Sequence, residues 1–321
     1  MKAIQITQTG GPEVLKYVDL PDPKPGPGQA LIDVKAIGVN FMDIYNRSGL
    51  YRTNVPMILG GEGAGTVSQI GSGVTDIKAG DRVAWASGGS SYAEKVVNQA
   101  ERLVKLPQGV NFELGATAML QGMTAHYLSH DTYPLKKGDM CLIHAAAGGV
   151  GQSLVQLAKL CGATVIATVS TQDKATLVKG LGADHVILYS QQDFAEEVKR
   201  ITGGQGVEVV YDSVGATTFD KGLEILKPRG YMVLYGQSSG LPNPVSPATL
   251  QAKSLFMTRP GLGHYTATRE DLVRRATAVF NLIAQGKLKM QIFGTYPLKD
   301  AAEAHRRLEN RETTGKLLLV P

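Results

Sequence analysis

The sequence predicts an α/β protein in which a doubly wound parallel sheet is joined to a smaller β-rich domain. One observation is an apolar run from Cys141 that leads through a small-residue turn into apolar residues at helical spacing as far as Lys159. A second is that further β-branched runs alternate with helical patterns after it, as in parallel sheets. A third is the regular series of short strands before residue 106, which is typical of a small barrel.

The first hundred residues contain strand patterns separated by turns rich in glycine and proline, such as the Pro21–Gly28 stretch. One helical segment, Phe41–Arg47, interrupts them directly after Asn40. The expected strands are Lys2–Thr7, Val14–Asp19, Ala30–Val39, Gly65–Ile70, Arg82–Ala86 and Tyr92–Val97.

The period then changes to helical over Asn111–Thr132, and the chain enters the strand, turn and helix that begin at Cys141. Gly148, Gly149 and Gly151 lack side chains that would keep a pyrophosphate away from the backbone at the helix N-terminus. The spacing departs from G-x-G-x-x-G, since Ala146 stands at the first glycine position. An ordinary strand-to-helix turn therefore remains an alternative for this segment taken alone.

Five more strands follow the glycine turn, and a ligand of such a sheet lies over the carboxyl ends of its strands. The expected strands are Ala163–Val169, Val186–Tyr189, Val207–Tyr211, Tyr231–Tyr235 and Ser254–Thr258. The helical patterns between them begin near Gln172, Asp193, Thr217 and Pro247.

The last sixty residues predict a helix opened by the capping box Thr268–Asp271, because a Thr three residues before an acid satisfies the first backbone N–H groups. A strand at Gln291–Thr295, a helix at Asp300–Glu309 and a strand at Lys316–Val320 complete the chain. We expect domains at 1–123, 124–261 and 262–321, the last returning to the first, since 321 residues exceed one ordinary core.

Composition narrows the class of protein. No apolar run approaches the roughly 20 residues of a membrane helix, and the N-terminus lacks a signal-peptide core, so a soluble cytoplasmic protein is expected. Cys141 and Cys161 form neither a disulfide framework nor a C-x-x-C ligand pair. The net charge of +5 comes from scattered Lys and Arg without interleaved aromatics, which makes nucleic-acid binding an unfavoured interpretation.

Six short motifs make the whole chain resemble the medium-chain dehydrogenase/reductase superfamily, and within it the zinc-free, NADPH-dependent quinone oxidoreductases of the zeta-crystallin type. They are Ala36–Asp43, Arg47–Tyr51, Ala145–Gly151, Tyr211–Gly215, Thr258–Pro260 and Tyr296–Ala301. The resemblance implies a GroES-like catalytic domain, a Rossmann domain, NADPH as cofactor, a quinone substrate and a homodimer.

The departures from the zinc alcohol dehydrogenases of this superfamily concern the metal. Those enzymes place a cysteine where this chain has Asn40 and a histidine where it has Gly61, and a catalytic zinc needs three protein ligands. We therefore expect no metal. His126 and His130 stand four residues apart without the glutamate of H-E-x-x-H, so we interpret them as packing residues.

The catalytic candidates come from the first domain and are Asn40, Asp43, Tyr45 and Tyr51. The resemblance implies that Asn40 lies beside the nicotinamide and that the Tyr45 hydroxyl donates to the acceptor oxygen. Such a donor would stabilise the charge that develops as hydride arrives. The alternative is that both tyrosines are packing aromatics and that Asp43 only orders its helix.

NADPH is the expected cofactor because the strand that ends at Val169 carries no acid at its tip, where NAD enzymes hold the ribose with Asp or Glu. Ser170 and Thr171 stand at that tip, Lys174 could reach a 2′-phosphate, and Tyr189 could donate or stack on the adenine side. Asp173 is close enough to argue for a ribose instead. Ser213 and Ser238 follow later strands, where a ligand above the sheet would pass. The resemblance implies further contacts at Asn40, Phe41, Met42, Asp43, Thr124, Gly148, Gly149, Val150, Gly151, Gly236, Gln237, Ser239, Arg259 and Lys316.

The sequence therefore predicts an NADPH:quinone oxidoreductase. Reduction of enones, enals or enoyl thioesters by the same hydride chemistry is one alternative. A non-enzymatic role, as an RNA-binding or crystallin-type protein, is another. RNA binding would need a continuous basic stripe, and the sequence shows only scattered basic pairs.

Overall fold

The computed structural model describes all 321 residues, which divide into two compact units. The first comprises residues 1–123, 266–286 and 290–321, and the second residues 124–265 and 287–289. Each is described by itself. None of the helices combines the length and the apolar character that crossing a membrane requires.

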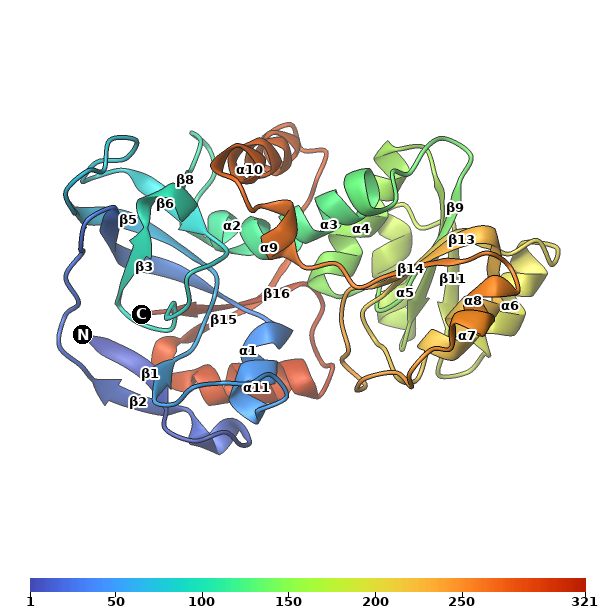
Figure 1. The fold of residues 1–321 in the computed structure, drawn as a ribbon, viewed down its shortest axis with the longest axis horizontal. Helices are drawn as coiled ribbons and strands as arrows, with labels where there is room; N and C mark the ends of the chain where they lie inside the picture. Colours follow the sequence, from blue (N-terminus) through green and yellow to red (C-terminus); the bar gives the residue numbers. More distant parts are fainter. The chain divides into compact units, whose positions relative to one another are not determined.

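The first unit is built on a seven-stranded sheet in the order β15-β16-β3-β5-β6-β8, with β7 paired to β3 (Figure 1). Its central strand β3 pairs antiparallel with β16 on one side and β5 on the other. The strands are β3 (Gln29–Val39), β5 (Gly63–Ile70), β6 (Arg82–Trp85), β7 (Lys95–Gln99), β8 (Val104–Lys105), β15 (Ile292–Pro297) and β16 (Lys316–Val320). The C-terminal return of the chain thus completes a sheet that the N-terminal strands begin.

A small three-stranded sheet, β2-β1-β4, packs its apolar residues into the same core as the large sheet. It consists of β1 (Lys2–Ile6), β2 (Lys16–Asp19) and β4 (Met57–Ile58). The core contains Ile4, Ile37, Val67, Trp85 and Leu317, all at most 2% exposed. Most residues of β3 and β16 are buried, so these two strands show no regular alternation of buried and exposed positions.

The helices of this unit include α1, α10 and α11. Helix α1 (Phe41–Ser48) starts directly after β3 and ends at Gly49, whose φ of 81° is the left-handed conformation that glycine adopts readily. Helix α11 (Ala301–Glu309) lies beside α1 (Figure 1), and side chains of the two helices are hydrogen bonded. Helix α10 (Arg269–Ala284) begins at the predicted cap, with the Thr268 hydroxyl accepting from Asp271 N at 3.0 Å.

The helical pattern predicted over 111–132 is one nearly continuous helix with two π-helical turns. It consists of α2 (Phe112–Thr117), the π-turn η3 (Ala118–Gly122), α3 (Met123–Tyr127) and the π-turn η4 (Leu128–Thr132). The short elements left are the 3₁₀ turns η1 (Pro12–Val14), η2 (Ala100–Arg102) and η5 (Leu298–Asp300), and α9 (Leu262–Tyr265).

The second unit is an all-parallel six-stranded sheet in the order β11-β10-β9-β12-β13-β14, which is the doubly wound order of a Rossmann fold. Its strands are β9 (Met140–Ile143), β10 (Thr164–Val169), β11 (His185–Leu188), β12 (Val207–Asp212), β13 (Leu226–Leu234) and β14 (Phe256–Thr258). The six predicted strands are confirmed within a few residues at their ends, except that β13 starts five residues before the predicted strand.

Helices connect these strands as the alternating pattern predicted. They are α4 (Gly149–Leu160), α5 (Gln172–Gly180), α6 (Phe194–Ile201), α7 (Phe219–Glu224) and α8 (Pro247–Gln251). Phe194 and Phe219 of α6 and α7 pack in one core with Leu142, Val210 and Met232 of the strands. Figure 1 shows α4 on the other side of the sheet, so the strands are covered on both faces.

Candidate functional site

Two groups of predicted site residues are assembled by the fold, one in each unit. In the second unit they stand where β9, β10, β11, β12 and β13 end, and in the first unit they stand around the N-terminus of α1. The group in the second unit is built mainly from loops that directly follow strands, which is where parallel sheets carry their ligands.

The glycine turn after β9 leads directly into α4, with Gly148 as the N-cap residue. A Cβ on Gly151 would lie 2.5 Å from the Ala145 carbonyl oxygen, so only glycine lets the helix approach the turn this closely. Gly148, Gly149 and Val150 are half-buried, and the first-turn N–H groups lack helical partners. This turn therefore fits an anionic group such as a pyrophosphate.

A hydrogen bond connects the loops that follow β10 and β11, because the Ser190 hydroxyl donates to the Ser170 carbonyl at 2.8 Å. Tyr189 follows β11, is 44% exposed and belongs to the same edge of the sheet. Thr171 caps α5 by accepting from Lys174 N at 3.3 Å. Ser170, Thr171, Lys174 and Tyr189 thus belong to one edge of the sheet, and their contact with a 2′-phosphate stays a prediction.

The loops after β12 and β13 are likewise connected to each other by hydrogen bonds. Ser238 N donates to the Ser213 carbonyl at 3.1 Å, and the Ser239 hydroxyl donates to the Val214 carbonyl at 2.8 Å. A Cβ on Gly236 would lie 2.8 Å from the Ser213 oxygen, which explains glycine there. The Arg259 guanidinium in turn donates to the Gln237 side chain.

Asp212, which the sequence analysis did not single out, orders the loop after β12. It is fully buried, and its Oδ1 accepts from Val214 N at 2.6 Å and from Gly215 N at 3.1 Å. Its Oδ2 accepts from the Thr218 hydroxyl at 2.8 Å. An acid at a strand end followed by Ser and Gly is a signal for such an Asx turn.

In the first unit, Asn40 connects β3 to α1 and is 5% exposed. Its backbone N–H donates to Asp43 Oδ2 at 2.8 Å, the half of a capping box in which the acid reaches back. Its side chain instead contacts Glu62 and Lys316, with Asn40 Nδ2 2.9 Å from Glu62 Oε2 and Lys316 Nζ 2.7 Å from Asn40 Oδ1.

Lys316 and Glu62 are both 0% exposed and form an ion pair with a 2.5 Å separation of Nζ and Oε2. Burial raises the pKa of Glu62, and the neighbouring Lys316 ammonium opposes that shift. The resemblance placed Lys316 at the cofactor, and that contact stays a prediction, because the ammonium shown here binds Glu62 and Asn40. Because Glu62 and Lys316 are 254 positions apart in the chain, no local sequence pattern indicates that they pair or that the pair is buried.

A second polar chain holds α1 from the other side. Asp43 Oδ2 accepts from the Tyr92 hydroxyl at 3.1 Å, and Tyr92 Oη lies 3.0 Å from His305 Nε2. Arg47 donates to His305 Nδ1 at 3.0 Å and pairs with Glu309 at 2.6 Å. Burial and then the Arg47 charge lower the pKa of His305 to about 3, so this histidine is neutral with its proton on Nε2.

Burial raises the pKa of Asp43 to about 7, against the hydrogen bond from Asn40 N and the Lys316 charge. Asp43 is thus a buried carboxyl group that titrates near neutral pH. It is hydrogen bonded to the start of α1 through Asn40 N and to the loop before β7 through the Tyr92 hydroxyl. Sequence reasoning named Asp43 and missed Tyr92 and His305. A lone buried Tyr and His give no sequence signal.

The aromatic candidates cluster on α1 and just after it. Tyr45 is 9% exposed, and its ring centroid lies 6.0 Å from that of Phe41 and 5.3 Å from that of Tyr51. Met42 is 46% exposed. The catalytic interpretation and the packing interpretation of Tyr45 and Tyr51 both stay predictions.

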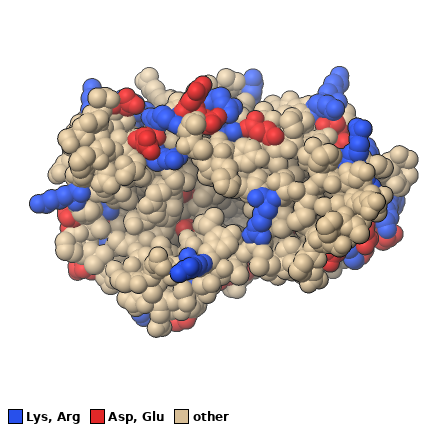
Figure 2. Space-filling view, viewed as in Figure 1, with Lys and Arg blue, Asp and Glu red and all other residues tan.

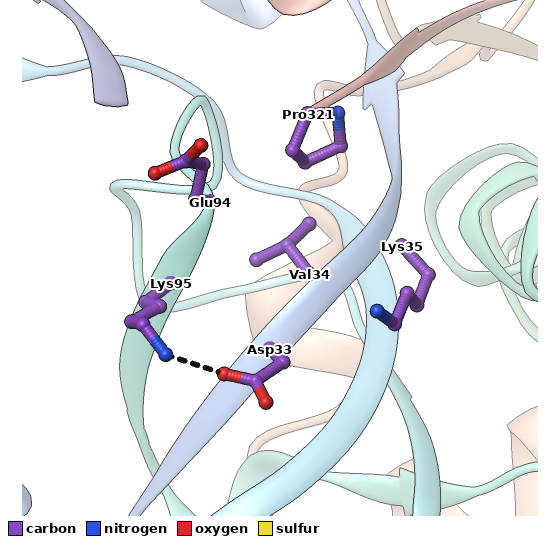
Figure 3. Close-up of a pocket in the computed structure, with 6 residues that line it drawn as sticks. All are labelled: Asp33, Val34, Lys35, Glu94, Lys95 and Pro321. Carbon is purple, nitrogen blue, oxygen red and sulfur yellow. Dashed lines mark hydrogen bonds and ion pairs between the residues drawn. The ribbon is translucent and has the colours of Figure 1, made fainter. Parts of the chain in front are cut away.

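Three features lie outside these groups. Among all 321 residues, no cluster of three or more His, Cys, Asp or Glu is placed to hold a metal ion. A hollow of about 350 Å³ is lined by Asp33, Val34, Lys35, Glu94, Lys95 and Pro321 (Figure 3). It contains no predicted site residue, and its Lys95 pairs with Asp33 at 2.9 Å. On the face in Figure 2, Lys and Arg stand apart or beside acids, without a continuous basic band.

Comparison with known proteins agrees with both units. Residues 26–137 match the alcohol dehydrogenase GroES-like domain, and residues 149–277 match the zinc-binding dehydrogenase family. A quinone oxidoreductase of Pseudomonas aeruginosa is 45% identical, covering 100% of this chain and 99% of the relative. The chain belongs to the quinone oxidoreductases of the medium-chain dehydrogenase/reductase superfamily.

Two further relatives bear on this family. The crystal structure of Escherichia coli quinone oxidoreductase complexed with NADPH is 44% identical and superposes with a TM-score of 0.98, covering 100% of both chains. A 2-haloacrylate reductase of Burkholderia is 42% identical, covering 99% of this chain and 98% of the relative. The predicted fold class, a Rossmann sheet with a GroES-like domain, is confirmed.

Proposed function

We propose that this protein is a metal-independent NADPH:quinone oxidoreductase. The observation that carries the proposal is that Asn40, the N-cap residue of α1, and Gly61, directly before Glu62, stand where the zinc dehydrogenases have two metal ligands. A site without a Lewis acid suits an acceptor that is already electrophilic, such as a quinone. Bound NADPH would supply a hydride, and water a proton, so that the quinone becomes a hydroquinone.

The residues of the second unit support NADPH as that cofactor. The Gly148–Gly151 turn and the α4 N-terminus would hold the pyrophosphate. The joined tips of β10 and β11 would hold the 2′-phosphate through Ser170, Thr171, Lys174 and Tyr189. Asp173 lies in the first turn of α5 rather than at the tip of β10, which leaves the strand end free of a repelling carboxylate.

The loops after β12, β13 and β14 would complete the cofactor site. Their joined arrangement supports contacts from Ser213, Gly236, Gln237, Ser238, Ser239 and Arg259. Thr124, Phe41, Met42 and Lys316 are proposed as contacts on the strength of the family alone.

In the first unit we assign the nicotinamide side to Asn40 and the acceptor side to Tyr45, with Tyr51 packed on the Tyr45 ring. The Tyr45 hydroxyl would donate to the acceptor oxygen as charge develops on it. Asp43 would order the N-terminus of α1, which carries both groups.

A second candidate is reduction of activated alkenes by the same hydride, which the 42% identity to 2-haloacrylate reductase favours. Steady-state assays with NADPH separate the two. Turnover of 1,4-benzoquinone or 9,10-phenanthrenequinone well above that of 2-alkenals and 2-chloroacrylate supports the quinone assignment, and the reverse ranking supports the alkene assignment. Turnover of neither class contradicts both.

We also propose a homodimer in the cytoplasm. Strand β14 ends the parallel sheet with one unpaired side, and Phe256 and Met257 on it are 51% and 41% exposed. An apolar sheet edge of this kind favours pairing with a second copy. Light scattering that gives a monomeric mass at micromolar concentration would contradict this.

An RNA role is tested by a mobility assay with AU-rich RNA, which we expect to show no shift.

A further inference from the structure

Glu62 is a fully buried carboxylate to which the proposed function gives no role. Its Oε1 accepts from Leu120 N at 2.6 Å. Its Oε2 accepts from Asn40 Nδ2 at 2.9 Å and from Lys316 Nζ at 2.5 Å. All three partners are donors, and each comes from a different segment of the chain.

The sheet of the first unit brings these groups together. Asn40 follows β3, Glu62 precedes β5, and Lys316 opens β16, and these three strands are neighbours in the order β16-β3-β5. Gly38 on β3 leaves the room for them. A Cβ there would lie 2.4 Å from Glu62 Oε2 and 2.6 Å from Lys316 Cε, so any side chain would displace the ion pair.

The Asn40 carboxamide has one satisfied orientation in this arrangement. Its Oδ1 accepts from Lys316, and its Nδ2 donates to Glu62 and, at 3.2 Å, to the Gly38 carbonyl. Turning the amide over would set Nδ2 against an ammonium and Oδ1 against a carboxylate and a carbonyl. Both hydrogens of Nδ2 are also engaged, so Asn40 has no N–H left for an acceptor oxygen.

We propose that Glu62 is a positioning residue of the nicotinamide site, which fixes the Asn40 carboxamide in one orientation with the help of Lys316. The inference rests on the proposed function for the place of Asn40 beside the nicotinamide. Its consequence is that Asn40 orients the ring that gives up the hydride, while polarisation of the acceptor falls to another donor.

Glu62→Gln tests this because it keeps the shape and changes the hydrogen bonding. A glutamine amide group at either oxygen position faces a donor: Leu120 N on one side, Asn40 Nδ2 and Lys316 Nζ on the other. The Asn40 orientation is then no longer enforced. Misplacement of reacting atoms by about 1 Å can cost 10²-fold, so we expect kcat to fall by about 10- to 100-fold.

The measurements are kcat, the Kd for NADPH, and the primary isotope effect on kcat with NADPH deuterated at the transferred C4 position. In Glu62→Gln we expect a lower kcat, a nearly unchanged Kd and a larger isotope effect, because hydride transfer becomes slower. Val67→Ala is the control, since it removes core volume from β5 without touching Asn40. It should lower the melting temperature and leave kcat and the isotope effect as in the wild type.

Glu62→Asp, which keeps the charge, provides a second test if the glutamine variant does not fold. Combined with Asn40→Ala it should lower kcat no further than Asn40→Ala alone, because Glu62 acts through Asn40. Additive losses, or a folded Glu62→Gln with wild-type kcat and isotope effect, would overturn the inference. If the wild type reduces neither acceptor class, the proposed function fails, and non-additive melting temperatures of Asn40→Ala and Glu62→Asp still report whether Glu62 holds Asn40.

Discussion

The sharpest quantitative prediction concerns Asp43→Asn and the pH dependence of stability. Asp43 is 2% exposed, and burial raises its pKa from 3.8 to about 7. The folded protein therefore binds this proton more tightly than the unfolded chain. At about 1.4 kcal/mol per pKa unit, the difference is worth about 4 kcal/mol.

The sign follows from the raised pKa. The contribution of Asp43 to stability is fully present below pH 3.8 and is lost as pH rises through about 7. Asparagine keeps an acceptor for Asn40 N and the Tyr92 hydroxyl, which both bind Asp43 Oδ2, and does not titrate. The free energy of unfolding of the wild type minus that of Asp43→Asn should thus fall by about 4 kcal/mol from about pH 4 to about pH 8.

Urea unfolding followed by tryptophan fluorescence measures this difference, because the single tryptophan, Trp85, is fully buried in the same unit. The lowered pKa of His305 gives a slope of the opposite sign at acidic pH, but wild type and variant share it, so it cancels in the difference. A difference that stays constant with pH would refute the assignment of a raised pKa to Asp43.

Three further predictions concern the reaction. Exhaustive chelation should leave the rate of quinone reduction unchanged, and stoichiometric zinc that is lost together with activity would contradict this. Tyr45→Phe should lower kcat by about 10²-fold or somewhat less with NADPH affinity intact, because one oxyanion donor is lost; an unaltered kcat with a weak acceptor would mean that Tyr45 only packs. Lys174→Ala should weaken NADPH binding by about 10- to 150-fold, the worth of a charge-assisted hydrogen bond, and leave NADH nearly unaffected. Titration calorimetry with both cofactors checks this, and equal loss of both would contradict a 2′-phosphate contact.

Much of the fold could be predicted from local pattern. The glycine turn before α4, the alternation of strands and helices and the Thr268 cap all appear in the structure as expected. The boundaries differ where tertiary pairing decides them. Two-residue strands such as β4 and β8 carry no periodicity of their own and exist because a neighbouring strand pairs with them.

The positions of the second-unit candidates in the sheet were also predictable in outline. Parallel strands end at one edge, so strand order alone places Ser213 and Ser238 at that edge, and their contact with a cofactor stays a prediction. The joining bonds between the tips, such as Ser190 to Ser170, depend on backbone geometry that no spacing rule supplies.

The sequence by itself determined which residue types are available, namely glycines at a helix N-terminus, no acid at the tip of β10, and Asn40 and Gly61 in place of metal ligands. Only the tertiary structure decided that Glu62, Lys316 and Asn40 form one buried group, and that Tyr92 and His305 support Asp43. The physical reason is that these contacts cross between strands and helices distant in the chain. Burial then raises the pKa of Asp43 and Glu62 and lowers that of His305, and burial belongs to the assembled core rather than to any local pattern.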